Sequence, residues 1–562
     1  MDPLILVNHR FDIPLAVRLR EQVDGARTVV TCPHLADRCQ SEGLSTELLK
    51  LPGSDVIASA YHAARADARA LQRRVDRALA DFDPDAPGCD WQQLDFFYLF
   101  YTLKGWASLW SQVLAQNADA TWHVPMPDQP FRYGCHSFLP ALTLLERLGA
   151  AGRPLRAYAY ALPAYAPGAV PDLRGRADAD APDLISHLPT CFYDHRHFEQ
   201  AMLASGRRCL NLRSATYDVE LPALRSAPLV ALADLTDTLT PSQQDRIATV
   251  CHALTATLDQ ALAPLLASER YRQPQVAALV DGLRRQMVFS AALTRDLGAR
   301  PPRTLLLSNH DAGLHGPLLS FARRHRVQVL MVPHSKIFNA PVVSQGLDLQ
   351  CLPHPVQGLP VHDADGRAVP APALAFPEQL RWRCEAPKPL RTLGVLLTGV
   401  SYSGLCGTDL DRFVRGLREI IDTCRRQGVG CRIRCKPSEP MVGMLVRELG
   451  LPQDQLLNDM GGSLDDFATA CDLCITYDQL TSGAIDLLRL GVPTLHALVR
   501  PLLQEEACMM DVAIVPRLLV PELQQRLALF AADGRQLWSF GRDQFQAYAR
   551  AWASARPLAA FL

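Results

Sequence analysis

Short apolar runs alternate with segments of helical periodicity along most of this chain, and this alternation limits the possible folds more than any other feature. Near the start, Leu4–Val7 and Thr28–Val30 are strand-like runs separated by a helical pattern over 13–22. The same rhythm returns over 304–332 and again over 393–498. Strands that alternate with helices form parallel sheets covered on both faces. The sequence therefore predicts an α/β protein with Rossmann-like domains.

Interruptions of this rhythm predict the domain boundaries. The first Rossmann-like domain is expected over 1–350, with a helical insertion at about 219–297, where long Ala/Leu periodicity replaces the strand pattern. The irregular, proline-rich stretch 351–390 is the predicted linker. A second Rossmann-like domain is expected over 391–535, followed by an amphipathic helix over 536–562. No GxGxxG motif follows the first strand, so no dinucleotide site is predicted there.

Composition excludes several classes of protein. Of the 562 residues, 48% are hydrophobic and 20% are charged, which suits packed cores and argues against disorder. Lys+Arg 57 nearly equals Asp+Glu 58, so a nucleic-acid partner is not expected. The sequence contains no apolar run of membrane-spanning length and begins with no signal-peptide pattern. We therefore expect a cytoplasmic protein whose cysteines are reduced thiols, and leave peripheral membrane contact open.

Three polar loops follow predicted strands in the second domain. Ligands of open α/β sheets bind outside the carboxyl ends of the strands, so these loops are the expected binding sites. Small residues and helix starts favour anions, and cations neutralise them. The candidate anion-binding residues are Gly399, Ser401, Ser403 and Gly404 in the first loop, Arg434, Lys436 and Ser438 in the second, and Thr481, Ser482, Gly483 and Asp486 in the third. A flexible turn, a solvated strand end and a simple N-cap are the respective alternatives.

Together these motifs resemble a known family. The strand end Ile433-Arg434-Cys435-Lys436-Pro437, the Thr481-Ser482 pair with Asp486, and the Gly491-Val492-Pro493 turn resemble the nucleotide-binding half of GT-B glycosyltransferases of bacterial surface polysaccharides. The similarity extends to the capsule-type sialyl-, Kdo- and CDP-glycerol transferases. Lys436 stands where a histidine is usual. The resemblance is clear over roughly 390–500 and weaker over 300–335, where a Pro333-His334-Ser335 turn replaces a QHG-like one.

The resemblance implies a two-domain GT-B fold whose domains face a cleft, and a reaction without a metal or other cofactor. The second domain would hold a CMP- or UDP-linked sugar by its phosphates, and the C-terminal helix would cross back onto the first domain. The first domain would present a surface glycan or glycolipid acceptor and a general base. Candidates for the base are His310, Asp311 and Asp128, and His334 and Ser335 would line the cleft. Each aspartate alone is more often a cap or turn residue.

Two other functions remain open from the sequence. A sugar-nucleotide epimerase shares the layout of two Rossmann-like domains. A transferase-like subunit without activity, serving in assembly, is the second alternative, because Lys436 replaces the usual histidine. No metal site is predicted, since the pairs Cys431/Cys435 and Cys471/Cys474 lack the further ligands that zinc requires. The aromatic helix expected over 92–116 is interpreted as buried, with a lipid-facing surface as the alternative.

Overall fold

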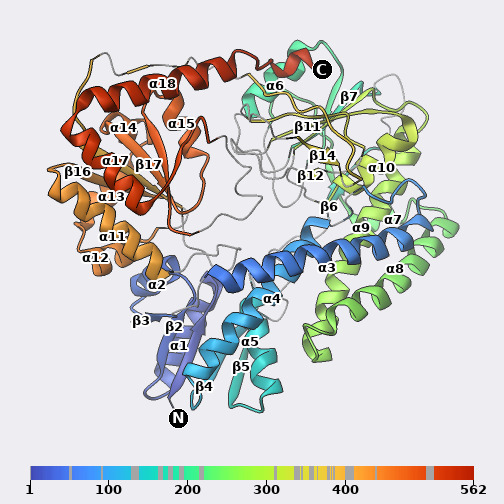
Figure 1. Cartoon of the computed structure of the whole chain (residues 1–562). Coiled ribbons are helices and arrows are strands. Elements are labelled where there is room, and N and C mark those ends of the chain that lie inside the picture. Colours follow the sequence, from blue (N-terminus) through green and yellow to red (C-terminus); the bar gives the residue numbers. More distant parts are fainter. Residues whose placement is uncertain are drawn as a thin grey trace. The chain divides into compact units, whose positions relative to one another are not determined.

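The computed structural model is an α/β protein built on parallel sheets (Figure 1). In the part of the chain that it describes, three five-stranded sheets are parallel throughout, and we number them sheets 1 to 3 in chain order. The described residues are 2–49, 54–89, 91, 93–127, 138–161, 169–174, 181–188, 195–213, 221–308, 313–333, 342–343, 346–353, 360–363, 365–375, 380, 382–383, 386–398, 410–436, 440–500 and 512–562.

The chain divides into two compact units. The first comprises Met1–Ala63, Tyr101–Pro163 and Glu378–Ala551, and it contains sheets 1 and 3. The second comprises Ala64–Phe100, Ala164–Pro377 and Trp552–Leu562, and it contains sheet 2. The stretch 1–350, expected to be one Rossmann-like domain, thus contributes two separate sheets, and these belong to different units.

Sheet 1 has the order β3-β2-β1-β4-β5. Its strands are β1 (Pro3–Val7), β2 (Arg27–Val30), β3 (Thr46–Leu48), β4 (Thr121–Pro127) and β5 (Leu155–Tyr160). The short helix η1 (Arg10–Asp12) and the helices α1 (Ile13–Gln22), α2 (Pro33–Ser41), α4 (Gln93–Gln116) and α5 (Leu139–Ala150) connect them, while α3 (Ser54–Ala80) continues into the second unit. The aromatic helix is α4, and its Trp106 and Trp110 are buried, which places these two side chains in the protein core.

Sheet 3 has the order β16-β15-β17-β18-β19. Its strands are β15 (Thr392–Leu397), β16 (Gly430–Cys435), β17 (Leu473–Tyr477), β18 (Thr494–Leu498) and β19 (Arg517–Leu519). Its helices are α11 (Leu410–Arg426), α12 (Val442–Leu449), α13 (Gln453–Gly461), α14 (Leu464–Thr469), α15 (Gly483–Arg489), α17 (Val520–Ala532) and α18 (Gly534–Trp552). Ser463 begins α14 with a reciprocal capping box to Asp466, as its spacing indicates.

Sheet 2 has the order β13-β11-β10-β7-β8. Its strands are β7 (Leu184–His187), β8 (Cys209–Asn211), β10 (Thr304–Ser308), β11 (Gln328–Val332) and β13 (Leu349–Gln350). The same unit contains α6 (His195–Ala204), α7 (Leu232–Thr236), the paired long helices α8 (Pro241–Leu262) and α9 (Glu269–Leu297), α10 (His315–His325) and η2 (Leu558–Ala560) (Figure 1). Short strands complete it: β6 (Ala169–Pro171) with β9 (Leu229–Ala231), and β12 (Val342–Val343) with β14 (His362–Asp363).

The C-terminal segment contributes to both units. Helix α18 belongs to the first unit up to Ala551, whereas Trp552–Leu562 belong to the second. There, Arg556 pairs with Leu374 as an isolated bridge, and Leu558 is part of the core cluster that contains Leu184 and Leu330. The end of the chain is therefore anchored in the unit built on sheet 2.

Candidate functional site

The strand order of sheet 3 selects one place for a ligand. If the strands are numbered in the order in which they appear in the chain, their order across the sheet is 2-1-3-4-5. The chain adds strands on one side of β15 and then on the other, so the order reverses between β15 and β17. Ligands of open α/β sheets bind at such a reversal, outside the carboxyl ends of the strands. The strands end at Leu397 and Tyr477, which pair with each other. Two of the three predicted loops start there, one after β15 and one after β17.

Many predicted site residues cannot be placed from the structure. Those that lie outside the described residues are Asp128, His310, Asp311, His334, Ser335, Gly399, Ser401, Ser403, Gly404 and Ser438. The described ones are Arg434, Lys436, Thr481, Ser482, Gly483 and Asp486. They lie in β16, directly after it, or in α15 and the two residues before it, so the described residues are those predicted to bind the nucleotide.

The cations of the second loop have different surroundings. Arg434, in β16, donates a hydrogen bond from its guanidinium to the backbone carbonyl of Asp459 in the last turn of α13. This contact gives Arg434 a structural role at the end of a helix. Lys436 follows the strand and is exposed, while its backbone N–H donates to the carbonyl of Leu397 at 3.1 Å. Its backbone is thus attached to the end of β15, next to the reversal.

The third loop packs closely against β15. Thr481 accepts a hydrogen bond on Oγ1 from the Gly483 N–H at 3.3 Å, and Ser482 occupies the N-cap position of α15 without a side-chain capping bond. A Cβ atom at Gly483 would lie 3.0 Å from Cδ1 of Leu396. The start of α15 therefore approaches β15 at a distance that a larger residue would disturb. Asp486 lies in the first turn and is half-buried.

A buried ion pair beside this loop was not anticipated from the sequence. Asp478 directly follows β17, and its Oδ1 lies 3.5 Å from Nε of Arg500, with the two side chains 2% and 5% exposed. Asp478 also has a φ of 62°, in the left-handed region that non-glycine residues rarely adopt. Such conformations concentrate at functional sites because the surrounding structure must enforce them. The carboxyl ends of β17 and β18 thus enclose a charged pair away from solvent.

A second polar contact joins β17 and β18 within the strands that precede this pair. His496 in β18 is fully buried, and its Nδ1 lies 2.8 Å from Oγ1 of Thr476 in β17. Burial lowers the pKa of His496 to about 3, with a further contribution from the positive charges of Arg517 and Arg500. The imidazole is therefore neutral at physiological pH and serves as a hydrogen-bonding group.

Sheet 2 shows the same reversal with different residues. Its strand order also runs 2-1-3-4-5 by appearance, and the reversal lies between β7 and β10. His187 ends β7 and His315 begins α10; both are buried, and their rings meet edge to face at 5.8 Å. Nδ1 of His187 lies 3.1 Å from the carbonyl of Leu212. The predicted His310 and Asp311 come after β10 in the sequence but lie outside the described residues, and the histidine pair was not anticipated from the sequence.

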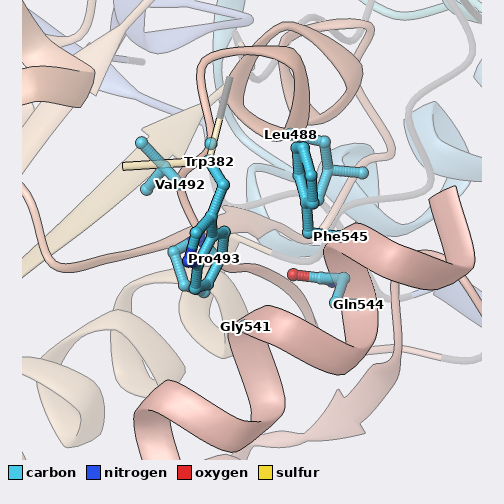
Figure 2. Close-up of a pocket in the computed structure, with 8 residues that line it drawn as sticks. Trp382, Leu488, Val492, Pro493, Gly541, Gln544 and Phe545 are labelled. Carbon is cyan, nitrogen blue, oxygen red and sulfur yellow. The ribbon is translucent and has the colours of Figure 1, made fainter. Parts of the chain in front are cut away.

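A crevice at the opposite end of sheet 3 is too small for a nucleotide sugar. Figure 2 shows Trp382, Val492, Pro493 and Phe545 around it, where α18 packs on the turn before β18. It leaves essentially no room even for a water molecule, whereas ligand sites usually have roughly 300–1,000 Å³. Gln544 lies beside it, accepting the Thr494 N–H at 2.8 Å and donating to the carbonyls of Thr494 and Ile514 at 2.6 and 2.7 Å. We interpret this crevice as a packing seam that anchors α18.

The described residues include no group of three or more His, Cys, Asp or Glu side chains arranged to hold a metal ion. The cysteines that can be placed are free thiols, including both members of the pairs Cys431/Cys435 and Cys471/Cys474. Within the same described ranges, the helices are all too short or too polar to cross a membrane.

Comparisons with known proteins give only distant likenesses. No family model and no curated protein matches the chain. Among solved structures, MurG of Acinetobacter baumannii is 11% identical, with a TM-score of 0.34, over 67% of this chain and 96% of that one. A UDP-N-acetylglucosamine 2-epimerase is 11% identical, with a TM-score of 0.32, over 66% of this chain and 93% of that one. The apo structure of OtsA is 12% identical, with a TM-score of 0.34, over 66% of this chain and 98% of that one. Likenesses at this level tell nothing about substrate or reaction.

Proposed function

We propose that this chain is a metal-independent GT-B glycosyltransferase that binds a nucleotide sugar at the carboxyl end of sheet 3. The observation that carries the proposal is the reversal of strand order between β15 and β17. The loops that follow these strands are the small, polar loops expected to bind phosphate. Sugar nucleotides carry their negative charge on phosphate, which such loops and a nearby cation recognise.

The exposed Lys436 is the cation that we assign to the donor phosphates. Its backbone is attached to Leu397 at the end of β15, whereas Arg434 already donates to the end of α13. The hydroxyls of Thr481 and Ser482 would add hydrogen-bond donors to the same phosphates, with the Gly483 N–H orienting the Thr481 hydroxyl, and Asp486 would accept from a ribose. Positive charge and fixed donors stabilise a departing nucleotide, because negative charge develops there as the sugar–phosphate bond breaks.

The acceptor and general base are assigned to the unit built on sheet 2. His310 and Asp311 follow β10 at the reversal of that sheet, and His187 and His315 gather at the same strand ends. A base at this position would remove the proton of an acceptor hydroxyl. Asp128, which follows β4 of sheet 1 in the sequence, remains a further candidate for the base, and His334 and Ser335, after β11, would line the cleft. The proposed acceptor is a bacterial surface glycan or glycolipid, modified at the cytoplasmic face of the inner membrane.

A product assay separates transfer from its two rivals. The purified chain would be incubated with UDP- and CMP-linked sugars and a mixture of short glycan and glycolipid acceptors, and followed by NMR. Release of free nucleotide together with a glycosylated acceptor supports the transferase. Conversion of the nucleotide sugar into its epimer would overturn the proposal in favour of an epimerase. Binding without turnover of any donor would favour a subunit without catalytic activity.

A further inference from the structure

The carboxyl end of sheet 1 carries a polar cluster that the proposed transfer reaction does not use. The order of this sheet reverses between β1 and β4. The turn after β1 contains Asn8, His9 and Asp12, and Thr31 follows β2, whose last residue pairs with the last residue of β1. By the same topological rule as for sheet 3, a ligand is expected at these strand ends.

The turn after β1 is fixed by a buried carboxylate. Asp12 is 1% exposed; its Oδ2 accepts the backbone N–H groups of Asn8 and His9 at 2.8 Å each. Its Oδ1 accepts the Tyr160 hydroxyl at 2.7 Å. Burial raises the pKa of Asp12 to about 6, although these three hydrogen bonds oppose the rise. The Asp12 carboxylate therefore fixes the backbone of this turn, and the turn fixes the position of His9.

His9 is held in one tautomer. Its Nδ1 accepts the Phe11 N–H at 3.3 Å, so the proton of the neutral ring resides on Nε2. The rings of Phe11 and Phe138 lie 5.0 and 4.9 Å from the imidazole and restrict its orientation. Burial, followed by the charges of Arg10, His34 and Arg38, lowers the pKa of His9 to about 4. Near pH 7 the ring is therefore a neutral N–H donor.

Cationic groups surround this imidazole. The Arg10 guanidinium lies 4.9 Å from the centre of the Phe11 ring, and Arg38 extends from α2; both side chains are exposed. His34, also on α2, has Nε2 3.6 Å from the Cys32 thiol. The Thr31 hydroxyl is fully buried and has no hydrogen-bond partner among the described residues. The carboxylate of Asp12, in the same turn, already accepts three hydrogen bonds, and that of Asp37, next to Arg38 on α2, accepts the Gly443 N–H. The cluster is consequently suited to an anion.

We propose that the residues at the carboxyl end of β1 and β2, with His9, Arg10 and Arg38 as the principal contacts, bind the phosphate group of a small molecule. Charged donors form the strongest hydrogen bonds to phosphate, and two guanidinium groups supply them here. A bound phosphate offsets the surrounding positive charge, so it favours the protonated form of His9. Binding and protonation of His9 are therefore coupled. The site lies on a different sheet from the donor site and does not depend on it.

The test is an NMR titration of the full-length protein with inorganic phosphate at pH 7, observing the His9 ring resonances, assigned from their loss in His9→Gln. We expect a saturable shift and an upward move of the His9 titration midpoint. Arg38→Ala should weaken phosphate binding about tenfold. Arg20→Ala removes the same charge from an exposed position on α1 and serves as the matched control. Glucose 1-phosphate and uridine monophosphate then distinguish a sugar phosphate from a nucleotide by which one binds tighter than phosphate itself.

Two results would overturn the proposal. The first is a His9 signal that does not respond to phosphate or to either ester. The second is a response that Arg38→Ala and Arg20→Ala weaken equally, which would mean general charge attraction. Lys436→Ala should leave the His9 response unchanged, so failure of the donor site and failure of this site can be told apart.

Discussion

Sheets 2 and 3 share one strand order but differ in what they place at its reversal. The end of sheet 3 carries the buried pair Asp478–Arg500 and the exposed Lys436, whereas the end of sheet 2 carries the imidazoles of His187 and His315. The strand order predicts a ligand site at each reversal. The side chains indicate different ligands, because an exposed cation suits phosphate while paired imidazoles suit proton transfer.

The largest expected effect comes from breaking the charged pair of sheet 3. Asp478→Ala leaves Arg500 buried without this carboxylate, and loss of one partner from a buried ion pair costs about 3–5 kcal/mol. The free energy of unfolding, from urea denaturation, measures the loss. The exposed pair Arg27–Glu47, at 2.9 Å, is the control, and Glu47→Ala should cost less than about 1 kcal/mol. Equal small losses in both variants would mean that the Asp478 pair contributes little.

The buried imidazole of sheet 3 predicts a dependence of stability on pH. The pKa of His496 falls from 6.5 in the unfolded chain to about 3 in the folded one, so the unfolded state takes up a proton first as pH decreases. The free energy of unfolding should therefore fall below pH 6.5, by about 2 kcal/mol at pH 5.

The variant His496→Gln keeps a polar group beside Thr476 but does not titrate, so it should lose that part of the pH dependence. His9 contributes in the same direction and Asp12 in the opposite one, and both remain in the variant. The difference between the two urea-denaturation profiles isolates His496. Identical profiles would show that this imidazole is accessible to protons in the folded state.

A smaller effect tests how sheets 1 and 3 are joined within their unit. Asp37 on α2 accepts the Gly443 N–H at 2.9 Å at the start of α12, and the two helices lie side by side (Figure 1). Asp37→Ala should cost about 1 kcal/mol, as loss of a helix cap does, while Asp37→Asn keeps an acceptor and most of the stability. Equal losses in the two variants would show that the negative charge matters more than the cap.

The sequence predicted what depends on local spacing. The Ser463–Asp466 capping box begins α14, as the spacing of these two residues indicates. The α/β rhythm correctly predicted parallel sheets. It did not predict that β5 and β7 belong to separate sheets, because consecutive strand–helix units read alike whether they extend one sheet or start another.

For the candidate site as well, the sequence indicated local features but not contacts between distant residues. The loops after β15 and β17 were predicted as a binding site because polar residues follow apolar strands, and this assignment stays a prediction. The contacts of Asp478 with Arg500 and of His187 with His315 join residues far apart in the chain, and the left-handed backbone of Asp478 has no sequence signature. Arg434 read as a phosphate ligand, yet its guanidinium reaches a carbonyl of α13, a partner that only the fold supplies.

The most direct test of the donor site is calorimetric titration of the protein with UDP, CDP, CMP and GDP, followed by the best ligand with two variants. Lys436→Ala removes the cation beside the reversal, and Lys388→Ala removes the same charge from an exposed position before the opposite end of β15. We expect one nucleotide to bind, about tenfold more weakly to Lys436→Ala and with unchanged affinity to Lys388→Ala. No binding by any nucleotide, or equal losses in both variants, would contradict the assignment of sheet 3 as the donor site.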